Sequence, residues 1–333
     1  MIIDHIIIGG SGFVGRHLRT SLNSSNVLIL DKNSPDVVKT NEIFILWDIR
    51  LPFIHMQLED IQFDENVVLH HLAAVHFDFQ AEFFETNVKG TQNVIDNFSF
   101  VTNWIFYSSV ATYGDSSSIR DESSNQLPTN DYGRSKLMME KTINEKKTLG
   151  ILKGKIVVVR PGVVFGEWNF GNVFNLMWLS SRFLPIGLDS NPIKSMAYVK
   201  NLVASTLFAL DKVGSNIPLI YNYVDYEQLG TRDLLRIIGS ANGSKPLFIP
   251  FSFVLGVSRL LNLPFKLIGK DFLVSPMRVK KFAQPTHFKA DKIRELGFVQ
   301  PIHPEEAVKR TINWIGSNDV KTLRAAWKGS FKD

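Results

Sequence analysis

The sequence contains no cysteine. Disulfide bonds, cysteine nucleophiles and zinc sites built on thiolates are therefore excluded. The lack of disulfides fits a reducing compartment such as the cytoplasm, and we predict a cytoplasmic location. The chain begins in an apolar run, with no charged segment before it and no small-residue cleavage site after it, so we identify no signal peptide. Internal repeats and low-complexity segments are also lacking.

A large excess of charge of one sign is lacking as well. Of the 333 residues, 44% are hydrophobic and 21% are charged, which is ordinary for a folded chain with a sizeable core. The net charge is +5 and the basic residues are scattered. Binding of an anionic small molecule accounts for this excess, so we predict no nucleic-acid partner.

Long uninterrupted hydrophobic runs are absent. The most apolar stretch, Pro246 to Phe265, is broken by Pro250, Arg259 and Pro264. A membrane-spanning helix needs about 20 apolar residues in succession. We therefore predict no transmembrane segment and expect a helix packed within the C-terminal half. Attachment of this stretch to a membrane interface is the alternative.

What the chain does carry is a glycine-rich turn between an apolar run, Ile6 to Ile8, and a helix-like run. Its glycines are spaced three apart. The first permits a tight turn, the second lets backbone amides approach a pyrophosphate, and the third allows close helix–strand packing. The positive end of the following helix attracts the phosphates. The pattern predicts a dinucleotide-binding turn comprising Gly9, Gly12, Phe13, Val14 and Gly15.

An acidic residue follows the second apolar run. Val27 to Leu30 ends in Asp31, sixteen residues after Gly15. A carboxylate at this place binds the ribose hydroxyls of adenosine and repels a 2′-phosphate. We therefore predict NAD rather than NADP as the cofactor. A turn or helix-capping aspartate is the structural alternative.

Further apolar runs at 43–47, 67–74 and 104–107 alternate with helix-like segments. This alternation predicts an α/β fold with a doubly wound parallel sheet (a Rossmann fold), whose ligand crevice lies at the carboxyl ends of the strands. His70, His71 and His76 lie near one strand end, but no metal-ligand spacing accompanies them. We predict no metal site and expect structural or cofactor-adjacent roles for these histidines.

Tyr132 and Lys136 are four residues apart at the start of a helix-like run, so they share a helix face. A lysine ammonium beside a phenol lowers the phenol pKa, which makes the tyrosine usable as a general base. Ser109, which follows the run ending at Tyr107, is placed to hydrogen-bond the reacting oxygen. We predict these three residues as catalytic; a plain helix surface is the alternative that the spacing alone leaves open.

The order of these motifs resembles that of the extended short-chain dehydrogenases/reductases, in the NAD-dependent sugar epimerase/dehydratase group similar to UDP-glucose 4-epimerase. The resemblance covers nearly the whole chain. Besides the glycine turn, it rests on Asp48-Ile49-Arg50, His71 to Ala74, Asn87 to Thr91, Ser108-Ser109 with Tyr113-Gly114, Tyr132 to Lys136, Arg160 to Gly166, and Leu296 to Phe298 with Pro301.

The resemblance implies an NAD-binding Rossmann domain over residues 1–165, to which later segments return, and a smaller substrate-binding domain mainly over residues 166–333. It implies a homodimer built through the helices that begin near Asn87 and Tyr132. It also implies a nucleotide-sugar substrate. Beyond the glycine turn and Asp31, the implied cofactor contacts are Asp48, Ile49, Leu72, Ala73, Ala74, Asn87, Tyr132, Lys136 and Pro161.

Two basic residues of the C-terminal half are candidate substrate contacts, together with Ser109. Lys194 stands where the family usually has an arginine that holds the diphosphate, and Ser195 stands where the family has an acid. Lysine keeps the charge but loses the bidentate fork of arginine. Arg278 lies in a region that often supplies a second phosphate contact. For Lys194, a solvated surface lysine is the alternative.

The resemblance implies 4-epimerisation, or reduction or oxidation at a 4-keto position, with Tyr132 as the base. The segment after Ser109 lacks the Asp-Glu pair of the resembling dehydratases, which disfavours dehydration. Two alternatives are a hydroxysteroid-type dehydrogenase, whose apolar substrate would suit the stretch from Pro246 to Phe265, and a non-catalytic NAD-binding regulator. Neither the sugar nor the nucleotide follows from the sequence.

Overall fold

The computed structural model describes residues 1–75, 80–115, 118–215, 217–267 and 276–329. A seven-stranded sheet occupies its centre, in the order β10-β6-β5-β4-β1-β2-β3, and every neighbouring pair is parallel. The strands are β1 (Ile2–Ile8), β2 (Val27–Asp31), β3 (Glu42–Leu46), β4 (Gln62–His71), β5 (Asn103–Tyr107), β6 (Lys155–Pro161) and β10 (Leu219–Tyr223). The predicted fold class is confirmed.

The direction in which the chain adds strands reverses between β1 and β4. Ile8, the last residue of β1, lies level with Leu30 of β2 and His71 of β4, so the three strands end side by side. In open α/β sheets, ligands bind beyond the carboxyl ends of strands at such a reversal. The topology therefore places the crevice beside the glycine turn.

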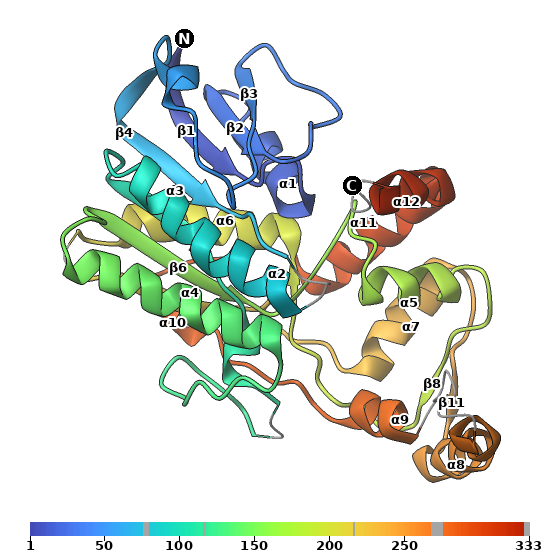
Figure 1. The fold of residues 1–333 in the computed structure, drawn as a ribbon. Coiled ribbons are helices and arrows are strands. Elements are labelled where there is room, and N and C mark those ends of the chain that lie inside the picture. Colours follow the sequence, from blue (N-terminus) through green and yellow to red (C-terminus); the bar gives the residue numbers. More distant parts are fainter. Residues whose placement is uncertain (76–79, 116–117, 216, 268–275, 330–333) are drawn as a thin grey trace.

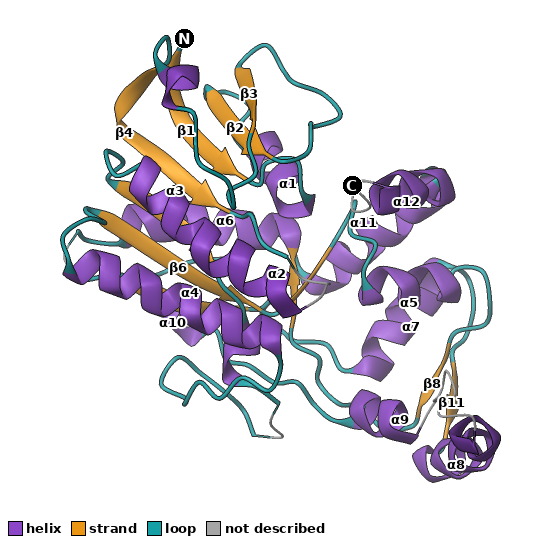
Figure 2. Cartoon of the chain, in the orientation of Figure 1, coloured by secondary structure: helices purple, strands orange, loops and turns teal. Residues whose placement is uncertain are grey.

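Helices cover both faces of this sheet (Figures 1 and 2). One face carries α1 (Phe13–Ser21) and α6 (Val199–Lys212), which pack on the core of β1, β2, β5 and β6. The other face carries α3 (Thr91–Asn97) and α4 (Asp131–Thr148). The helical turns α2 (Gln80–Phe84) and η2 (Glu85–Gly90, π-helical) lead into α3 and contact α4. Within the C-terminal half, residues 199–223 return to the sheet, through α6 on one face and through β10 at its edge.

Most of the remaining elements form a second lobe around its own apolar core, on the right of Figure 1. Its centre is the contact between α7 and α11, against which α5 packs. The elements outside the sheet layers are η1 (His55–Leu58), η3 (Val110–Tyr113), β7 (Val163–Phe165), α5 (Asn172–Ser180), β8 (Ile186–Leu188), β9 (Met196–Tyr198), α7 (Thr231–Ala241), β11 (Leu247–Ile249), α8 (Phe251–Leu267), α9 (Pro276–Ala283), α10 (Asp291–Glu295), α11 (Pro304–Ser317) and α12 (Val320–Gly329).

The apolar stretch from Pro246 to Phe265 forms β11 and most of α8. We expected this helix to be packed inside the C-terminal half, and that expectation is only partly met, because Phe253 and Leu260 are 63% and 68% exposed. Among the described residues, no helix is both long enough and apolar enough to cross a membrane.

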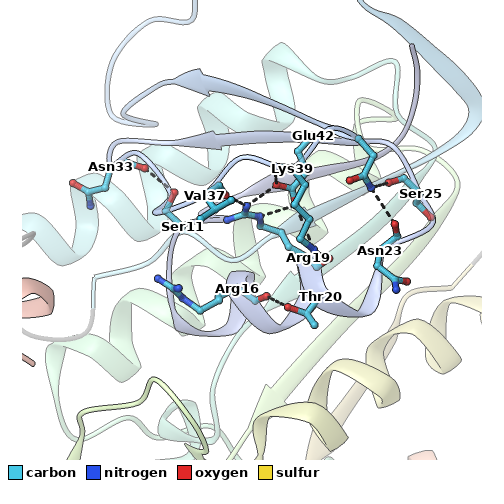
Figure 3. A network of polar contacts seen from close by, with 11 residues as sticks. Ser11, Arg16, Arg19, Thr20, Asn23, Ser25, Asn33, Val37, Lys39 and Glu42 are labelled. Carbon is cyan, nitrogen blue, oxygen red and sulfur yellow. Dashed lines mark hydrogen bonds and ion pairs between the residues drawn. The ribbon is translucent and has the colours of Figure 1, made fainter. Parts of the chain in front are cut away.

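A buried ion pair fastens α1 to the first residue of β3 (Figure 3). The guanidinium of Arg19 donates to both carboxylate oxygens of Glu42, at 3.0 and 2.6 Å, and also to the backbone oxygen of Val37. Ser11 Oγ, in the glycine turn, donates to the backbone oxygen of Asn33 at 2.7 Å. These bonds fix the 33–42 segment beside the turn.

This pair predicts an unequal response to the loss of two arginines. Arg19→Met leaves the Glu42 carboxylate buried without its partner, so the free energy of unfolding in urea should fall by about 3–5 kcal/mol. The matched control is Arg236→Met, which removes an exposed pair with Asp233 and should cost less than about 1 kcal/mol. Equal losses for the two variants would contradict this assignment.

Candidate functional site

The glycine turn lies against the loop that follows β4. Gly9 has a φ of +86°, and a Cβ there would lie 2.6 Å from the backbone nitrogen of Ala73. A Cβ on Gly15 would lie 2.6 Å from the backbone oxygen of Gly9, whereas one on Gly12 would have that oxygen as its only neighbour, at 3.4 Å. Gly9 and Gly15 are thus required for packing, and Gly12 faces open space.

That open side adjoins the first turn of α1. Gly12 is the N-cap residue, no side chain caps the helix, and its first turn has no acidic residue. The free amide groups and the helix dipole favour an anion at this position. Phe13 and Val14 are half-buried and pack toward the second lobe. The residues present therefore fit a dinucleotide pyrophosphate.

Asp31 ends β2 directly beside this turn. Its carboxylate accepts hydrogen bonds from the backbone amides of Ser11 and Asn33, both at 3.0 Å. Burial raises the pKa of this carboxyl, although the two amide bonds oppose the shift. The acid thus lies where the sequence pattern predicts a ribose contact.

Asp48 and Ile49, at the end of the next strand, are held by protein contacts. Asp48 forms a two-pronged ion pair with Arg50, with Nη2 to Oδ2 at 2.5 Å. Burial works against ionisation of Asp48, but the hydrogen bonds and charge of Arg50 hold its pKa below the usual value. Ile49 is buried against Gly90. Contact of either residue with a cofactor stays a prediction.

The loop after β4 is anchored at two points. The backbone amides of Leu72 and Ala73 both donate to the backbone oxygen of Ile8, at 2.8 and 3.0 Å. Beyond the half-buried Ala74, the amide of Val75 donates to Asn87 Oδ1 at 3.0 Å.

Asn87 continues this link toward α4. It is fully buried, and its Nδ2 donates to Ser135 Oγ at 2.9 Å. Ser135 Oγ in turn donates to the backbone oxygen of Tyr132 at 2.8 Å. Asn87, predicted as a cofactor contact, therefore joins the loop after β4 to the first turn of the helix that carries Tyr132.

Ser109 and Tyr132 come together as the sequence predicts. Ser109 caps η3, accepting a hydrogen bond from the amide of Ala111 at 3.1 Å. The start of α4 presses directly on η3, since a Cβ on Gly133 would lie 2.4 Å from the backbone oxygen of Ala111. The side chains of Tyr132 and Ser109 are hydrogen-bonded to each other.

The pKa values of Tyr132 and Lys136 differ from those that the sequence predicts. Burial raises the pKa of Tyr132 to about 12, and the bond to Ser109 only partly offsets it. The ammonium of the buried Lys136 donates to the backbone oxygen of Tyr107 at 2.8 Å. Burial lowers the pKa of Lys136 to about 8, with the charge of Glu140 opposing. Burial therefore dominates the pKa of the phenol, the opposing contribution comes from Ser109, and the lowering by Lys136 that the spacing predicts is not found.

Behind these residues lies a buried charge network: the sequence motifs contain Ser108, Tyr113 and Arg160, but they did not predict that these residues meet Glu140. Arg160, at the end of β6, donates to both oxygens of Glu140, at 2.9 and 2.6 Å, and to the Tyr113 hydroxyl at 2.7 Å. Ser108 Oγ donates to Glu140 Oε1 at 2.5 Å. The network joins α4 to the ends of β5 and β6. The available signal was spacing, since Glu140 follows Lys136 by four residues on the same helix face.

Pro161 ends β6 in a buried position next to this network. Of the histidines at the end of β4, His71 contacts Thr91 Oγ1 at 2.8 Å and His70 contacts His5 at 3.1 Å. Burial lowers the pKa of His71 to about 3 and that of His70 well below its usual range. His76 lies outside the described residues. Within the described part of the chain, no cluster of three potential metal ligands is present.

The two basic residues predicted as substrate contacts, unlike Ser109, lie in the second lobe. Lys194 lines a small pocket with Phe165, Met196 and Gln228, and its ammonium donates to the backbone oxygen of Gln284 at 2.5 Å. Arg278 lies on α9, and its side chain is outside the described residues. Contact of either with a substrate stays a prediction.

Comparisons with known proteins bear on this arrangement. A model of the NAD dependent epimerase/dehydratase family matches residues 5–222. The chain is 34% identical to N-acetyl-alpha-D-glucosaminyl-diphospho-ditrans,octacis-undecaprenol 4-epimerase of Escherichia coli O157:H7, over 93% of this chain and 94% of that protein. It is 25% identical to UDP-glucose 4-epimerase of Vibrio cholerae, over 92% and 93% of the two chains.

Solved structures give the same fold. The UDP-glucose 4-epimerase of Thermus thermophilus, in complex with NAD, superposes with a TM-score of 0.72 at 19% identity, over 94% of this chain and 99% of that one. UDP-glucuronic acid 4-epimerase from Bacillus cereus, also with NAD, gives 0.72 at 19% identity, over 94% and 98%.

The position of Asp31 predicts a cofactor preference. Titration of the protein with NAD and with NADP should show tighter binding of NAD, because the carboxylate repels a 2′-phosphate. Asp31→Ala should weaken NAD binding by about 1.5–3 kcal/mol and thereby reduce the difference between the affinities for NAD and NADP. Asp36→Ala, in the same loop but on its exposed side, is the control and should preserve the preference. Equal or tighter binding of NADP by the unaltered protein would refute the assignment.

Proposed function

Because the chain belongs to the NAD-dependent epimerase/dehydratase family, we propose that it is an NAD-dependent 4-epimerase acting on a sugar carried by a diphosphate. The observation that carries this proposal is the hydrogen-bonded pair of Ser109 and Tyr132, with Lys136 one helical turn away. Asn87 links this pair to the loop packed on the glycine turn.

The glycine turn would hold the pyrophosphate of NAD, and Asp31 the hydroxyls of its adenosine ribose. When bound, NAD supplies reversible acceptance of a hydride from the sugar carbon. The remaining cofactor contacts that we propose are Asp48, Ile49, Leu72, Ala73, Ala74, Tyr132, Lys136 and Pro161, with Asn87 positioning the loop.

Tyr132 is the proposed base. Its raised pKa keeps the phenol protonated in the free protein at neutral pH. The positive charge of the oxidised nicotinamide ring of NAD would favour the phenolate. The ammonium of Lys136 would act in the same direction, and it is largely protonated at pH 7 because its pKa is about 8. Tyr132 then takes the proton of the C4 hydroxyl as that carbon is oxidised, and Ser109 hydrogen-bonds the same oxygen. Once the 4-keto sugar has turned over, C4 would take the hydride back on its other face and the oxygen would regain its proton from Tyr132, which gives the epimer with no net oxidation.

The carrier of the sugar has two candidates. The predicted carrier is a nucleotide, and the Vibrio cholerae relative is named for a UDP-sugar. The E. coli relative, with 34% identity against 25%, is named for a sugar on undecaprenol diphosphate. Both carriers present a diphosphate, for which Lys194 and Arg278 are the proposed contacts. Both relatives are 4-epimerases, which favours this function over a net reductase, a steroid-type dehydrogenase or a regulator.

We also propose that residues 1–165, together with α6 and β10, bind the cofactor and that the second lobe binds the sugar. The proposed homodimer uses η2, α3 and α4, which pack side by side on one face of the sheet. The proposed location is the cytoplasm.

Replacement of the base gives the first test of this function. Tyr132→Phe keeps the ring, so folding and NAD binding should survive, while epimerisation should fall by the ~10²–10⁴-fold typical of a lost general base. Tyr107→Phe removes a buried hydroxyl bonded to Thr206 and serves as the control. Turnover by Tyr132→Phe near the unaltered rate would show that the proposed mechanism is wrong.

The diphosphate contacts give a second test. Lys194→Ala and Arg278→Ala should each weaken substrate binding by about 1–3 kcal/mol, the scale of a hydrogen bond to a charged group. Lys153→Ala, at an exposed site on the sheet domain, should leave binding unchanged. Unaltered substrate affinity in the Lys194 and Arg278 variants would contradict their assignment as diphosphate contacts.

A further inference from the structure

Helix α8 has its apolar side turned outward. Four apolar residues at positions spaced by one and two helical turns are exposed by 40–68%, while two polar residues on the inner side are only 2% exposed. The exposed residues are Phe253, Val257, Leu260 and Leu261, here called the α8 stripe; the buried polar residues are Ser258 and Asn262. A helix that packs only on its own protein buries its apolar stripe, so the α8 stripe needs a partner.

The α8 stripe lies at an extremity of the molecule. Figure 1 shows α8 at the lower right, at the edge of the second lobe and far from the central sheet. It contacts α9, whose Met277 is 70% exposed. The helix therefore protrudes where a flat surface could reach it.

Basic residues predominate in the sequence around the stripe, although the carboxylate of Asp189 accepts a hydrogen bond from the backbone amide of Phe251 at the start of α8. Residues 234–290 contain one acidic residue, Asp271, and nine basic ones: Arg236, Lys245, Arg259, Lys266, Lys270, Arg278, Lys280, Lys281 and Lys289. Arg259, within α8, and Lys280, within α9, are exposed. A basic helix with an apolar stripe is suited to the interface of an anionic membrane, where each lysine or arginine near the surface adds to the attraction. A second copy of the chain would bring the same positive charge to this surface and be repelled.

We propose that α8 docks on an anionic lipid bilayer, with the α8 stripe immersed at the level between headgroups and acyl chains. The helix lies along the surface and does not span it, in line with its length and interruptions. The alternative that the sequence left open for this stretch is thereby favoured.

Docking has a consequence for the substrate, and this step rests on the proposed function. α9 contacts α8, and Thr286, three residues beyond the end of α9, pairs with Lys194. The proposed diphosphate contacts are thus connected to the docking helix by a short segment of chain. A membrane-bound sugar diphosphate presents its phosphates at the headgroup level. Docking therefore favours a polyprenyl diphosphate as the carrier.

The test is co-sedimentation of the full chain with vesicles of phosphatidylcholine, with or without phosphatidylglycerol. The protein should bind the anionic vesicles, and Phe253→Glu/Leu260→Glu should lose at least about tenfold in affinity, since each side chain leaves the apolar phase. Arg259→Gln should lose about fivefold on anionic vesicles only. Met56→Glu/Leu149→Glu, which changes two exposed apolar residues of the sheet domain, is the matched control and should bind normally.

Failure of the unaltered protein to bind anionic vesicles, or an equal loss in the control variant, would overturn the proposal. Conversion of a dimer to a monomer by Phe253→Glu/Leu260→Glu, seen by light scattering without lipid, would also overturn it and assign the stripe to a second copy. Vesicle binding without epimerisation of any sugar diphosphate would uphold docking and contradict the proposed function. Epimerisation without vesicle binding would contradict docking and uphold the proposed function.

Docking also separates the two carriers. Phe253→Glu/Leu260→Glu should epimerise a UDP-sugar in solution at the unaltered rate if the nucleotide is accepted at all. With a polyprenyl-diphosphate sugar in vesicles, its rate should fall at least about tenfold, in step with binding. An unaltered rate on the vesicle substrate would contradict a role for docking in substrate capture.

Discussion

The contact between two backbones at the ends of β1 and β4 sets the geometry of the site. A Cβ at Gly9 would lie 2.6 Å from the nitrogen of Ala73, so a side chain cannot be accommodated between the two segments. The oxygen of Ile8 accepts hydrogen bonds from Leu72 and Ala73, which locks the segments together. The Gly12 side of the turn stays open, and the glycine turn is held at a fixed distance from the segments attached to the loop after β4.

Helix α4, which carries Tyr132, is attached to that same loop. Hydrogen bonds run from Val75 through Asn87 and Ser135 to the backbone of Tyr132. On its side facing the sheet, α4 is held against β5 and β6 by the hydrogen bonds of Glu140 to Arg160 and Ser108. Burial of all these groups also explains the perturbed protonation: the phenol of Tyr132 is stabilised in its neutral form, and Lys136 has a pKa of about 8. Such a site is ready to respond to a positive charge brought by a ligand.

Local patterns in the sequence were sufficient for much of this arrangement. The glycine turn, Asp31 and the apolar strands depend on short segments, so their placement follows from spacing alone. The face shared by Tyr132 and Lys136 is likewise local, and the meeting of Tyr132 with Ser109 followed from the order of the motifs. Long-range contacts lay beyond such patterns. The acceptor of the Lys136 ammonium is a backbone oxygen 29 residues away in sequence, and the partner of Glu140 is 20 residues away.

The outward face of α8 shows the same limit. Its composition predicted a helix, but the burial of Ser258 and Asn262 on one side of α8 depends on contacts beyond the helix, and no local pattern specifies that side. The prediction of a lowered pKa for Tyr132 was not met for a related reason, since desolvation of the phenol depends on the whole surrounding structure.

The central claim is that bound NAD lies beside Tyr132 and makes its phenol ionisable. The most direct measurement is the ultraviolet difference spectrum of tyrosinate on addition of NAD at mildly alkaline pH. We expect a tyrosinate band in the unaltered protein, since the cofactor's positive charge lowers the pKa of Tyr132 from about 12. The band should be missing in Tyr132→Phe. No band in the unaltered protein despite NAD binding, or the same band in Tyr132→Phe, would contradict the account.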